Sequence, residues 1–240
     1  MSRSLYDDIP APKSSPQSGT GSKVFGMFDR AYCINLAERF DRRRSAEMQF
    51  ESIGLHDVVF ILGSSPADEG VFRTQGTHGC ALSHARIFRQ AKEEGLEAVV
   101  IFEYDVVFSE GFHERLIPIL EDLKKVEWDL FYFFHPVKGG FDLRGDRGDV
   151  LASHPSGLLQ TAGTVKTHAY AIHSRCLDVL IEKTDPSYLS EHLPLEIRAV
   201  DKAIATLDLR FYACHSDLVY QDPGLFSSIE TGIIPPSFDY

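Results

Sequence analysis

Short apolar segments alternate with longer segments of helical periodicity from residue 24 onward, and this alternation constrains the fold more than any other feature. Five-residue apolar runs such as 98–102 (AVVIF) and 130–134 (LFYFF) are typical of strands buried on both faces. Between them lie amphipathic stretches such as 78–94, which ends before Gly95. Strands that alternate with helices predict an α/β fold whose mixed, mainly parallel sheet is flanked by helices.

The individual elements follow from the same patterns. We expect helices at 39–53, 78–94, 112–125, 174–182 and 195–207, and strands at 28–36, 58–62, 98–102, 130–134, 167–172 and 210–214. The first helix has Phe40, Met48, Phe50 and Ile53 among its apolar positions, and Gly54 should end it. Because ligands of such sheets bind at the carboxyl ends of the strands, functional side chains are expected there.

The length of 240 residues, 43% of them hydrophobic, suits one large domain over 24–240. Residues 1–23 are rich in Ser, Pro, Gly and Lys, which predicts a disordered tail or a remnant of cloning. Residues 135–157 are rich in Gly, Asp and Arg and lack periodicity, which is typical of a lid or binding loop. The charged residues of that loop include Asp142, Arg144, Asp146, Arg147 and Asp149.

Composition disfavours several classes of function. The net charge of −11 makes nucleic acid a poor partner. No apolar run reaches about 18 residues, so we expect no transmembrane helix. We also expect no secretory signal, which predicts a cytoplasmic location, free or peripheral at the inner face of a membrane. The cysteines lie far apart, so we expect buried free thiols and no zinc site. They are Cys33, Cys80, Cys176 and Cys214.

Two acidic residues, Glu103 and Asp105, interrupt the apolar segment 99–108 (VVIFEYDVVF). A buried carboxylate is costly unless it is paired or binds a metal. In an extended strand both acidic side chains point to one side and Tyr104 points to the other. Such a pair can bind a hard divalent cation and leave positions for substrate phosphates. The alternative is a strand that reaches the surface, with both acids solvated beside a turn.

Three motifs together resemble glycosyltransferase family 25, which includes bacterial lipopolysaccharide galactosyltransferases and collagen galactosyltransferase domains. They are 32–41 (YCINLAERFD), 76–84 (GTHGCALSH) and 102–108 (FEYDVVF). Weaker matches follow in the same order, so the resemblance spans about 24–232. These are the strand 167–174 (THAYAIHS), Asp201, Gln221, Ser227, Ser228 and Ile229.

The resemblance implies a GT-A-type fold and an inverting hexosyltransferase that uses Mn²⁺ or Mg²⁺. The donor would be a UDP-sugar, often UDP-galactose, and the acceptor a hydroxyl of a glycan or other molecule, as in lipopolysaccharide biosynthesis. The sequence departs from the family at Tyr104, where the family has an acid. A catalytically weak or inactive module that binds a nucleotide-sugar or glycan therefore remains an alternative. A nucleotidyltransferase, which also uses paired acids and a metal, is a third.

The motifs and the resemblance together assign roles to individual residues. Donor binding is assigned to Asn35, Leu36, Arg42, Gly76, Ser83, His84, Glu103, Asp105 and Gln221. The divalent ion is assigned to Glu103 and Asp105, and catalysis to Asp105 and Asp201. Asp201 would be the general base that deprotonates the acceptor, with Glu196 in reserve, because an inverting transfer needs a carboxylate in that role. His168 and His215 are candidates for a further metal ligand.

Structural interpretations remain open for several of these residues. Asn35 could end its strand by bonding its own backbone, and Asp201 could favour the dipole of the helix that it begins. The arginines at 39 and 42–44 are expected mainly on a solvated helix face. Of these, Arg42 matches the family pattern and could bind a phosphate in a bidentate manner.

The glycine-rich motif at 76–84 is expected to form a second part of the site. Gly76, Thr77 and Gly79 would let backbone approach an anion closely at the start of a helix. Ser83 and His84 are not expected to form a nucleophilic pair, because adjacent helical side chains point about 100° apart. They would contact the donor or support the strand that carries the acids, or be merely structural.

Overall fold

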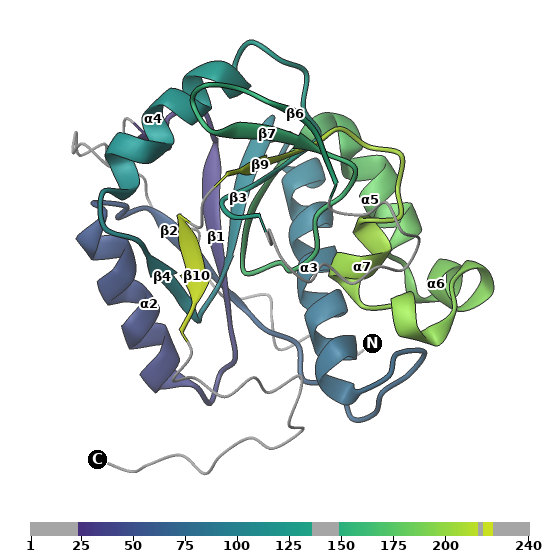
Figure 1. Cartoon of the computed structure of the whole chain (residues 1–240). Helices are drawn as coiled ribbons and strands as arrows, with labels where there is room; N and C mark the ends of the chain where they lie inside the picture. Colours follow the sequence, from purple (N-terminus) through teal and green to yellow (C-terminus); the bar gives the residue numbers. More distant parts are fainter. Residues whose placement is uncertain (1–23, 136–148, 216–217, 223–240) are drawn as a thin grey trace.

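The computed structural model describes residues 24–135, 149–215 and 218–222, and in these a mixed sheet lies between two layers of helices (Figure 1). The predicted α/β class with a mixed, mainly parallel sheet and flanking helices is confirmed. Some sequence-based predictions fall outside the described residues and stay predictions. They concern the tail at 1–23, Asp142, Arg144, Asp146, Arg147, Ser227, Ser228 and Ile229.

The strands and helices occur close to their predicted positions. The strands are β1 (Arg30–Asn35), β2 (Val58–Leu62), β3 (Ala98–Glu103), β4 (Val106–Phe108), β5 (Leu130–Tyr132), β6 (Val150–Ser153), β7 (Leu158–Thr161), β8 (Ala169–His173), β9 (Phe211–Cys214) and β10 (Val219–Gln221). The α-helices are α2 (Phe40–Ser52), α3 (Gln75–Glu93), α4 (Phe112–Leu123), α5 (Leu177–Lys183), α6 (Pro186–His192) and α7 (Val200–Ile204). Two 3₁₀ turns, η1 (Ser174–Cys176) and η2 (Leu195–Ile197), precede α5 and α7. None of the described helices has the length and apolar character needed to cross a bilayer.

Some elements differ from the prediction. The helix expected at 195–207 is divided into η2 and the short α7. The sequence did not predict four of the strands and one of the helices, which are β4, β6, β7, β10 and α6. Each of these strands has only three or four residues, which is too short for an alternating pattern to be distinctive.

The sheet has the strand order β2-β1-β3-β8-β5-β9-β7-β6. β1 pairs in parallel with both β2 and β3, while β8 is inserted antiparallel between β3 and β5. β9 continues parallel to β5, and the antiparallel β7 and β6 complete the edge. The carboxyl ends of β1, β2 and β3 therefore meet at one edge of the sheet, where a ligand site is expected. A separate two-stranded ribbon joins β4 to β10.

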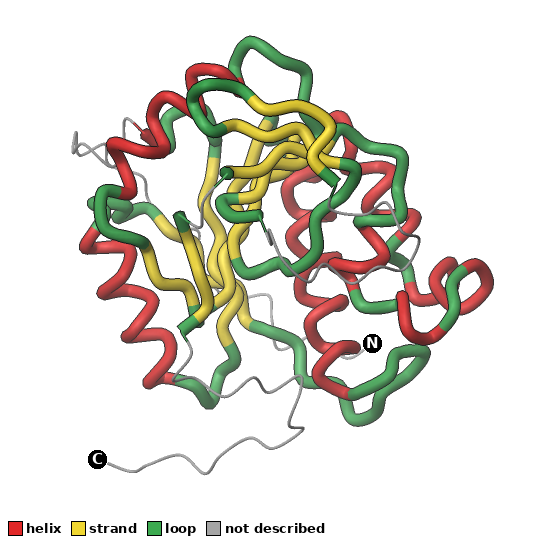
Figure 2. The backbone as a smooth tube through the Cα atoms, in the orientation of Figure 1, coloured by secondary structure: helices red, strands yellow, loops and turns green. Residues whose placement is uncertain are grey.

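Each face of the sheet has its own apolar core, as the alternation of side chains in a strand requires. On one face, Cys33, Val100 and Phe131 pack with apolar side chains of α2 and α4. On the other face, Tyr32 and Ile101 pack with α3, α5 and α7. Figure 2 shows the strands in yellow between these two groups of red helices. Fully covered central strands explain why β1 and β3 read as continuous apolar runs.

Helix α2 buries an unexpected side chain. Phe40 and Met48, two of the apolar positions expected on its inner face, are 77% and 63% exposed. The face that packs on the sheet instead carries Arg42, Ala46 and Phe50, and Arg42 is only 1% exposed. The inner face of the helix therefore includes an arginine, which a hydrophobic pattern cannot reveal.

Glycines end the first two predicted helices, as expected. Gly54 follows α2 with φ of 65°, and Gly95 follows α3 with φ of 66°. Glycine adopts this left-handed conformation without the steric cost that a Cβ atom brings. These two turns direct the chain into β2 and β3, whose ends form the ligand edge of the sheet.

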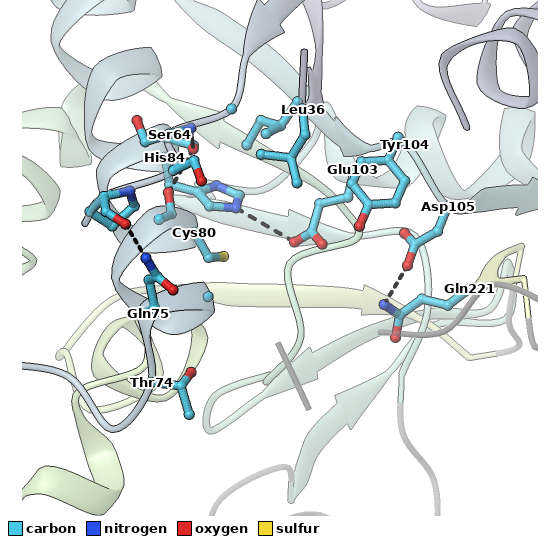
Figure 3. Close-up of a pocket in the computed structure, with 17 residues that line it drawn as sticks. Leu36, Ser64, Thr74, Gln75, Cys80, His84, Glu103, Tyr104, Asp105 and Gln221 are labelled. Carbon is cyan, nitrogen blue, oxygen red and sulfur yellow. Dashed lines mark hydrogen bonds and ion pairs between the residues drawn. The ribbon is translucent and has the colours of Figure 1, made fainter. Parts of the chain in front are cut away.

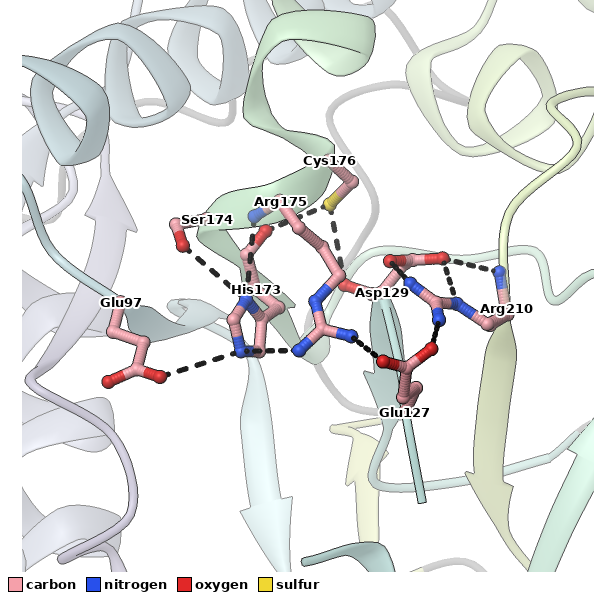
Figure 4. A network of polar contacts seen from close by, with 8 residues as sticks. All are labelled: Glu97, Glu127, Asp129, His173, Ser174, Arg175, Cys176 and Arg210. Atoms are coloured by element: carbon pink, nitrogen blue, oxygen red, sulfur yellow. Dashed lines mark hydrogen bonds and ion pairs between the residues drawn. The ribbon is translucent and has the colours of Figure 1, made fainter.

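A network of charges lies at the opposite end of the sheet (Figure 4). Asp129, just before β5, accepts hydrogen bonds from Nε and Nη2 of Arg210, just before β9, at 2.9 and 2.8 Å. The backbone N–H of Arg210 also donates to Asp129 at 2.9 Å. Burial opposes ionisation of Asp129, but the bonds from Arg210 outweigh it and hold its pKa below the usual value. This network joins strand starts and lies far from the ligand edge, which indicates a structural role.

Replacing Asp129 with Ala should lower the free energy of unfolding by about 2 kcal/mol, because the backbone N–H and Nε of Arg210 lose the buried acceptor that joins them to the start of β5. Urea denaturation of both proteins measures the difference. The control is Glu121→Ala, which removes an exposed ion pair with Lys124 and should cost less than about 1 kcal/mol. Equal losses in the two variants would contradict the structural role of Asp129.

Candidate active site

A cavity lies at the carboxyl ends of β1 and β3, beside the first turns of α3 (Figure 3). Seven of the residues assigned to the donor from the sequence line it. They are Leu36, Gly76, Ser83, His84, Glu103, Asp105 and Gln221. They come from α3, β3, β10 and the turns that follow β1 and β3, so the fold brings separate sequence motifs into one place.

Glu103 ends β3 and holds its carboxylate inside the cavity, with 17% of the side chain exposed. The hydroxyl of Thr167 donates to Oε1 at 2.7 Å, and Nε2 of His84 lies 3.5 Å from the same oxygen. Burial acts to raise the pKa of Glu103, but His84 and the Thr167 hydroxyl outweigh it, so the pKa is lowered. Glu103 is therefore ionised at neutral pH in the absence of any ligand.

Asp105 follows in the turn between β3 and β4. Its Oδ2 accepts a hydrogen bond from Nε2 of Gln221 at 3.1 Å, and its backbone oxygen accepts one from the N–H of Asp222 at 2.8 Å. The other carboxylate oxygen, Oδ1, is buried and has no hydrogen-bond partner among the described residues. Burial and the nearby charge of Glu103 raise the pKa of Asp105 to about 7. An added cation would relieve this repulsion.

The predicted alternation of side chains stops at Glu103. β3 ends there and Tyr104 and Asp105 form a turn, so Tyr104 lines the cavity together with both acids instead of pointing away. The guanidinium of Arg42 lies over the ring of Tyr104, 4.5 Å from its centroid, and also donates a hydrogen bond to the hydroxyl. Tyr104, which stands where the family has an acid, thus covers the buried Arg42 on the side of the cavity.

Ser83 fixes the loop after β2. Its hydroxyl donates to the backbone oxygen of Gly79 at 2.7 Å and accepts from the backbone N–H of Ser64 at 2.9 Å. A Cβ atom on Gly79 would lie 2.3 Å from the backbone oxygen of Ser64, so only glycine permits this approach. Ser83 and Gly79 therefore hold the cavity wall through backbone contacts.

His84 points away from Ser83, as adjacent helical residues must. Its Nδ1 lies 2.8 Å from the hydroxyl of Tyr170, and its Nε2 faces Glu103. Cys80, one helical turn before His84, lies on the same side of α3. Ligand atoms of Cys80, His84 and Glu103 all lie within 4.8 Å of one another. The sequence predicted no zinc site because its possible ligands are not clustered along the chain. In the folded chain these three ligands do cluster.

Several predicted residues lie outside the lining of the cavity. Asn35 donates to the backbone oxygen of Leu36 at 2.8 Å, which is the local bond expected of an Asn that ends a strand.

Asp201 accepts from the backbone N–H groups of Lys166 at 3.0 Å and Lys202 at 2.8 Å. Burial chiefly raises the pKa of the Cys80 thiol, and the charges of Glu103 and Asp201 raise it further. The carboxylate of Asp201 is thus within electrostatic reach of the cavity.

The two reserve histidines differ in their surroundings. His168 is buried and stacks on Phe134 at 3.9 Å between ring centroids, with Nε2 3.2 Å from the backbone oxygen of Val219. Burial lowers the pKa of His168 to about 4, so it is neutral at pH 7. His215 is exposed, and its backbone N–H donates to the oxygen of Gly157 at 2.8 Å. Neither ring is shown to touch the paired acids, and Glu196 is also exposed.

Three side chains that lie beside Glu103 or His84 were not predicted from the sequence as part of the site. Thr167 bonds Glu103 and Tyr170 bonds His84, and both come from the segment that enters or forms β8. Only the three-dimensional pairing of β8 with β3 brings them there. Cys80 could have been found, because Cys80 and His84 have the spacing that places two side chains on one face of a helix.

The paired acids fit a hard divalent cation. Glu103 is held ionised, and Asp105 has a buried oxygen without a protein donor. Carboxylate oxygens are the ligands that Mn²⁺ and Mg²⁺ prefer. With Gln221 beside them, the two residues could hold such an ion at the cavity.

Comparison with known proteins agrees with the motifs. Residues 28–138 match the sequence model of glycosyltransferase family 25 (LPS biosynthesis protein), so the predicted resemblance is confirmed. The chain is 34% identical over 151 residues to the inactive glycosyltransferase 25 family member 3 of Mus musculus, covering 53% of this chain and 26% of that protein. It is 27% identical over 246 residues to the procollagen galactosyltransferase 1-B of Xenopus laevis, covering 86% of this chain and 39% of that protein.

A solved glycosyltransferase involved in the glycosylation of the major capsid of PBCV-1 aligns with a TM-score of 0.45 and 11% identity, over 84% of this chain and 95% of that chain. The curated relatives are much longer than the part matched here, since the chain spans 26% of one and 39% of the other. The activities that their names describe belong to those longer proteins.

Replacing Asp105 with Asn should stabilise the metal-free protein at pH 8 by about 2 kcal/mol, because it removes an ionised carboxylate that is buried beside Glu103. The folded pKa near 7 exceeds the unfolded value near 3.8, so ionisation costs stability above pH 4 and the full cost is reached above pH 7. Urea denaturation with a chelator present measures the gain at pH 8 and pH 5. The gain should shrink at pH 5.

The matched control is Asp57→Asn, which changes an exposed acid and should shift stability little at either pH. A gain for Asp105→Asn that is absent, or that is the same at both pH values, would contradict the burial and repulsion described for Asp105.

Proposed function

We propose, from the match of residues 28–138 to glycosyltransferase family 25, that this chain moves a hexose from a UDP-sugar to a hydroxyl of a glycan or other acceptor. The observation that carries the proposal is the pair Glu103 and Asp105 in one cavity with Gln221 and the start of α3. A nucleoside diphosphate brings two negative phosphates that need cationic and N–H partners.

Each group in the cavity has a separate role in this proposal. Glu103 and Asp105 would hold Mn²⁺ or Mg²⁺, which when bound offsets the charge that develops on the departing diphosphate. Thr167 and His84 keep Glu103 ionised and oriented, and Gln221 orients Asp105. The backbone near Gly76 and Gly79 at the start of α3 lets the donor approach closely. Asn35 and Arg42 lie just behind this lining and are proposed as further donor contacts.

Asp201 is the proposed general base. An inverting transfer needs a carboxylate that takes the acceptor proton as the hydroxyl attacks the anomeric carbon from the side opposite the diphosphate. The carboxylate of Asp201 is fixed by two backbone N–H groups and is within electrostatic reach of Cys80 in the cavity wall. Galactose is the first sugar to test, because one relative is named a procollagen galactosyltransferase. The cytoplasmic location and a role in lipopolysaccharide biosynthesis stay predictions.

A second candidate is a module that binds the nucleotide-sugar but transfers nothing. Two observations favour it: Tyr104 replaces an acid in the family motif and is held by Arg42, and one relative is named as inactive. The two candidates differ in turnover but agree on binding.

Adding a UDP-sugar together with Mn²⁺ should raise the melting temperature by several degrees, and either one alone should raise it less, because the ion and the diphosphate bind as one unit. A thermal-shift panel of UDP-sugars measures this effect. Asp105→Asn should abolish the shift and any release of UDP in the presence of acceptor sugars. An unchanged shift or unchanged release of UDP in Asp105→Asn would refute the site, and release of pyrophosphate from a nucleoside triphosphate would indicate a nucleotidyltransferase.

Replacing Tyr104 with Asp should tighten Mn²⁺ binding by about tenfold, because it adds a third carboxylate to the turn that carries Asp105. Titration calorimetry with Mn²⁺ and UDP measures the affinity. Tyr104→Phe is the control, since it keeps the ring under Arg42 and adds no charge. An affinity for Mn²⁺ that does not rise in Tyr104→Asp would argue against an ion beside this turn.

A further inference from the structure

We propose that Cys80, His84 and Glu103 form a second cation site, selective for Zn²⁺, in the wall of the cavity. The three residues supply one thiolate sulfur, one imidazole nitrogen and one carboxylate oxygen. Three protein ligands of this kind leave a fourth position of a tetrahedral zinc ion open, and the cavity borders all three residues.

The geometry is close to that of a zinc site. The candidate ligand atoms lie within 4.8 Å of one another. Ligands of a tetrahedral zinc ion, with bonds of about 2.0–2.3 Å, lie about 3.5 Å apart. A closure of roughly 1 Å is enough, and Nε2 of His84 and Oε1 of Glu103 are already 3.5 Å apart. Figure 3 shows the Cys80 sulfur beside this pair.

The nitrogen of His84 that faces the site is itself unusual. His84 is fully buried, and among the described residues Nε2 makes no hydrogen bond of regular geometry; it meets only the carboxylate oxygen of Glu103, at 3.5 Å. A buried polar atom without a partner is costly, so its position aimed at a sulfur and a carboxylate calls for an additional group. A metal ion would satisfy it.

A supporting shell is present around the three ligands. If Nδ1 of His84 donates its proton to the hydroxyl oxygen of Tyr170 at 2.8 Å, the lone pair of Nε2 is left for the metal. Thr167 donates to Oε1 of Glu103 and lies beside the Cys80 thiol. On binding, the Cys80 thiol releases its proton to solvent, and so does Nε2 of His84 in any molecule in which it carries the proton that faces Glu103.

The donor set separates this site from the paired acids. Thiolate and imidazole favour Zn²⁺ over Mn²⁺ and Mg²⁺, which prefer oxygen ligands. Glu103 belongs to both sites, and this part of the inference depends on the proposed function. Zn²⁺ bound to Cys80 would take Glu103 away from the ion that binds UDP, so Zn²⁺ should compete with donor binding. Cys80 thus becomes the residue through which zinc inhibits the chain.

Cobalt(II) spectroscopy tests the site without any turnover. The reduced, metal-free protein is titrated with Co²⁺, whose bond to a thiolate gives a charge-transfer band in the near ultraviolet. We expect one band-forming site per chain, displaced by one equivalent of Zn²⁺. Cys80→Ser and Cys80→Ala should lose the band and bind Zn²⁺ at least about 100-fold more weakly, and Tyr170→Phe about 10-fold more weakly. The control Cys176→Ser, in a buried thiol that donates to the backbone oxygens of Asp129 and His173, should keep the band.

The outcomes distinguish the two proposals. A missing band in the wild-type protein, or a band that persists in both Cys80 variants, overturns the zinc site while leaving UDP and Mn²⁺ binding to be judged separately. Competition is then measured with UDP and Mn²⁺ at fixed free Zn²⁺. Zinc should weaken UDP binding about 10-fold or more in the wild type and not in Cys80→Ser. Equal weakening in both proteins would show that zinc acts at the paired acids and would refute the role of Cys80.

Discussion

The negative charge of Glu103, held at the end of a strand that is buried on both faces, is the constraint around which the cavity is built. A carboxylate in this position is tolerated only because Thr167 donates to it and His84 stands beside it. Each of these supports depends on another part of the fold, since β8 pairs with β3 and α3 packs across β1 and β3. Asp105 has weaker support and is partly neutral at pH 7 without a cation. A positive ion in the cavity would therefore relieve the repulsion between the two acids.

The rest of the molecule serves to keep that edge in place. The two apolar cores fix the strands, and the network of Asp129 and Arg210 ties together strand starts at the far end. Gly79 and Ser83 bring the loop after β2 against α3, which narrows the cavity from one side. The β4–β10 ribbon brings Gln221 to Asp105 from the other side. Function here rests on a few polar contacts between elements that apolar packing has already positioned.

Much of this could be predicted from the sequence. The apolar runs of β1, β3 and β5 identified the sheet. The paired acids could be identified at the end of β3, because charged residues that interrupt an apolar run are visible in the sequence. The contact between Arg42 and Tyr104 could not be predicted. It arises because a turn replaces the strand geometry after Glu103 and because an arginine occupies the inner face of α2. The side chains that bond Glu103 and His84 could not be predicted from the sequence either. Thr167 and Tyr170 lie more than sixty positions away in the sequence and reach Glu103 and His84, respectively, only through strand pairing.

We propose above all that Glu103 and Asp105 hold a divalent ion against a nucleoside diphosphate. Anomalous X-ray scattering from Mn²⁺ in crystals grown with UDP measures this directly. We expect one manganese peak in contact with carboxylate oxygens of both residues, with the diphosphate of UDP bound to the same ion. A manganese peak or a UDP molecule bound elsewhere, with Glu103 and Asp105 contacting neither, would contradict it.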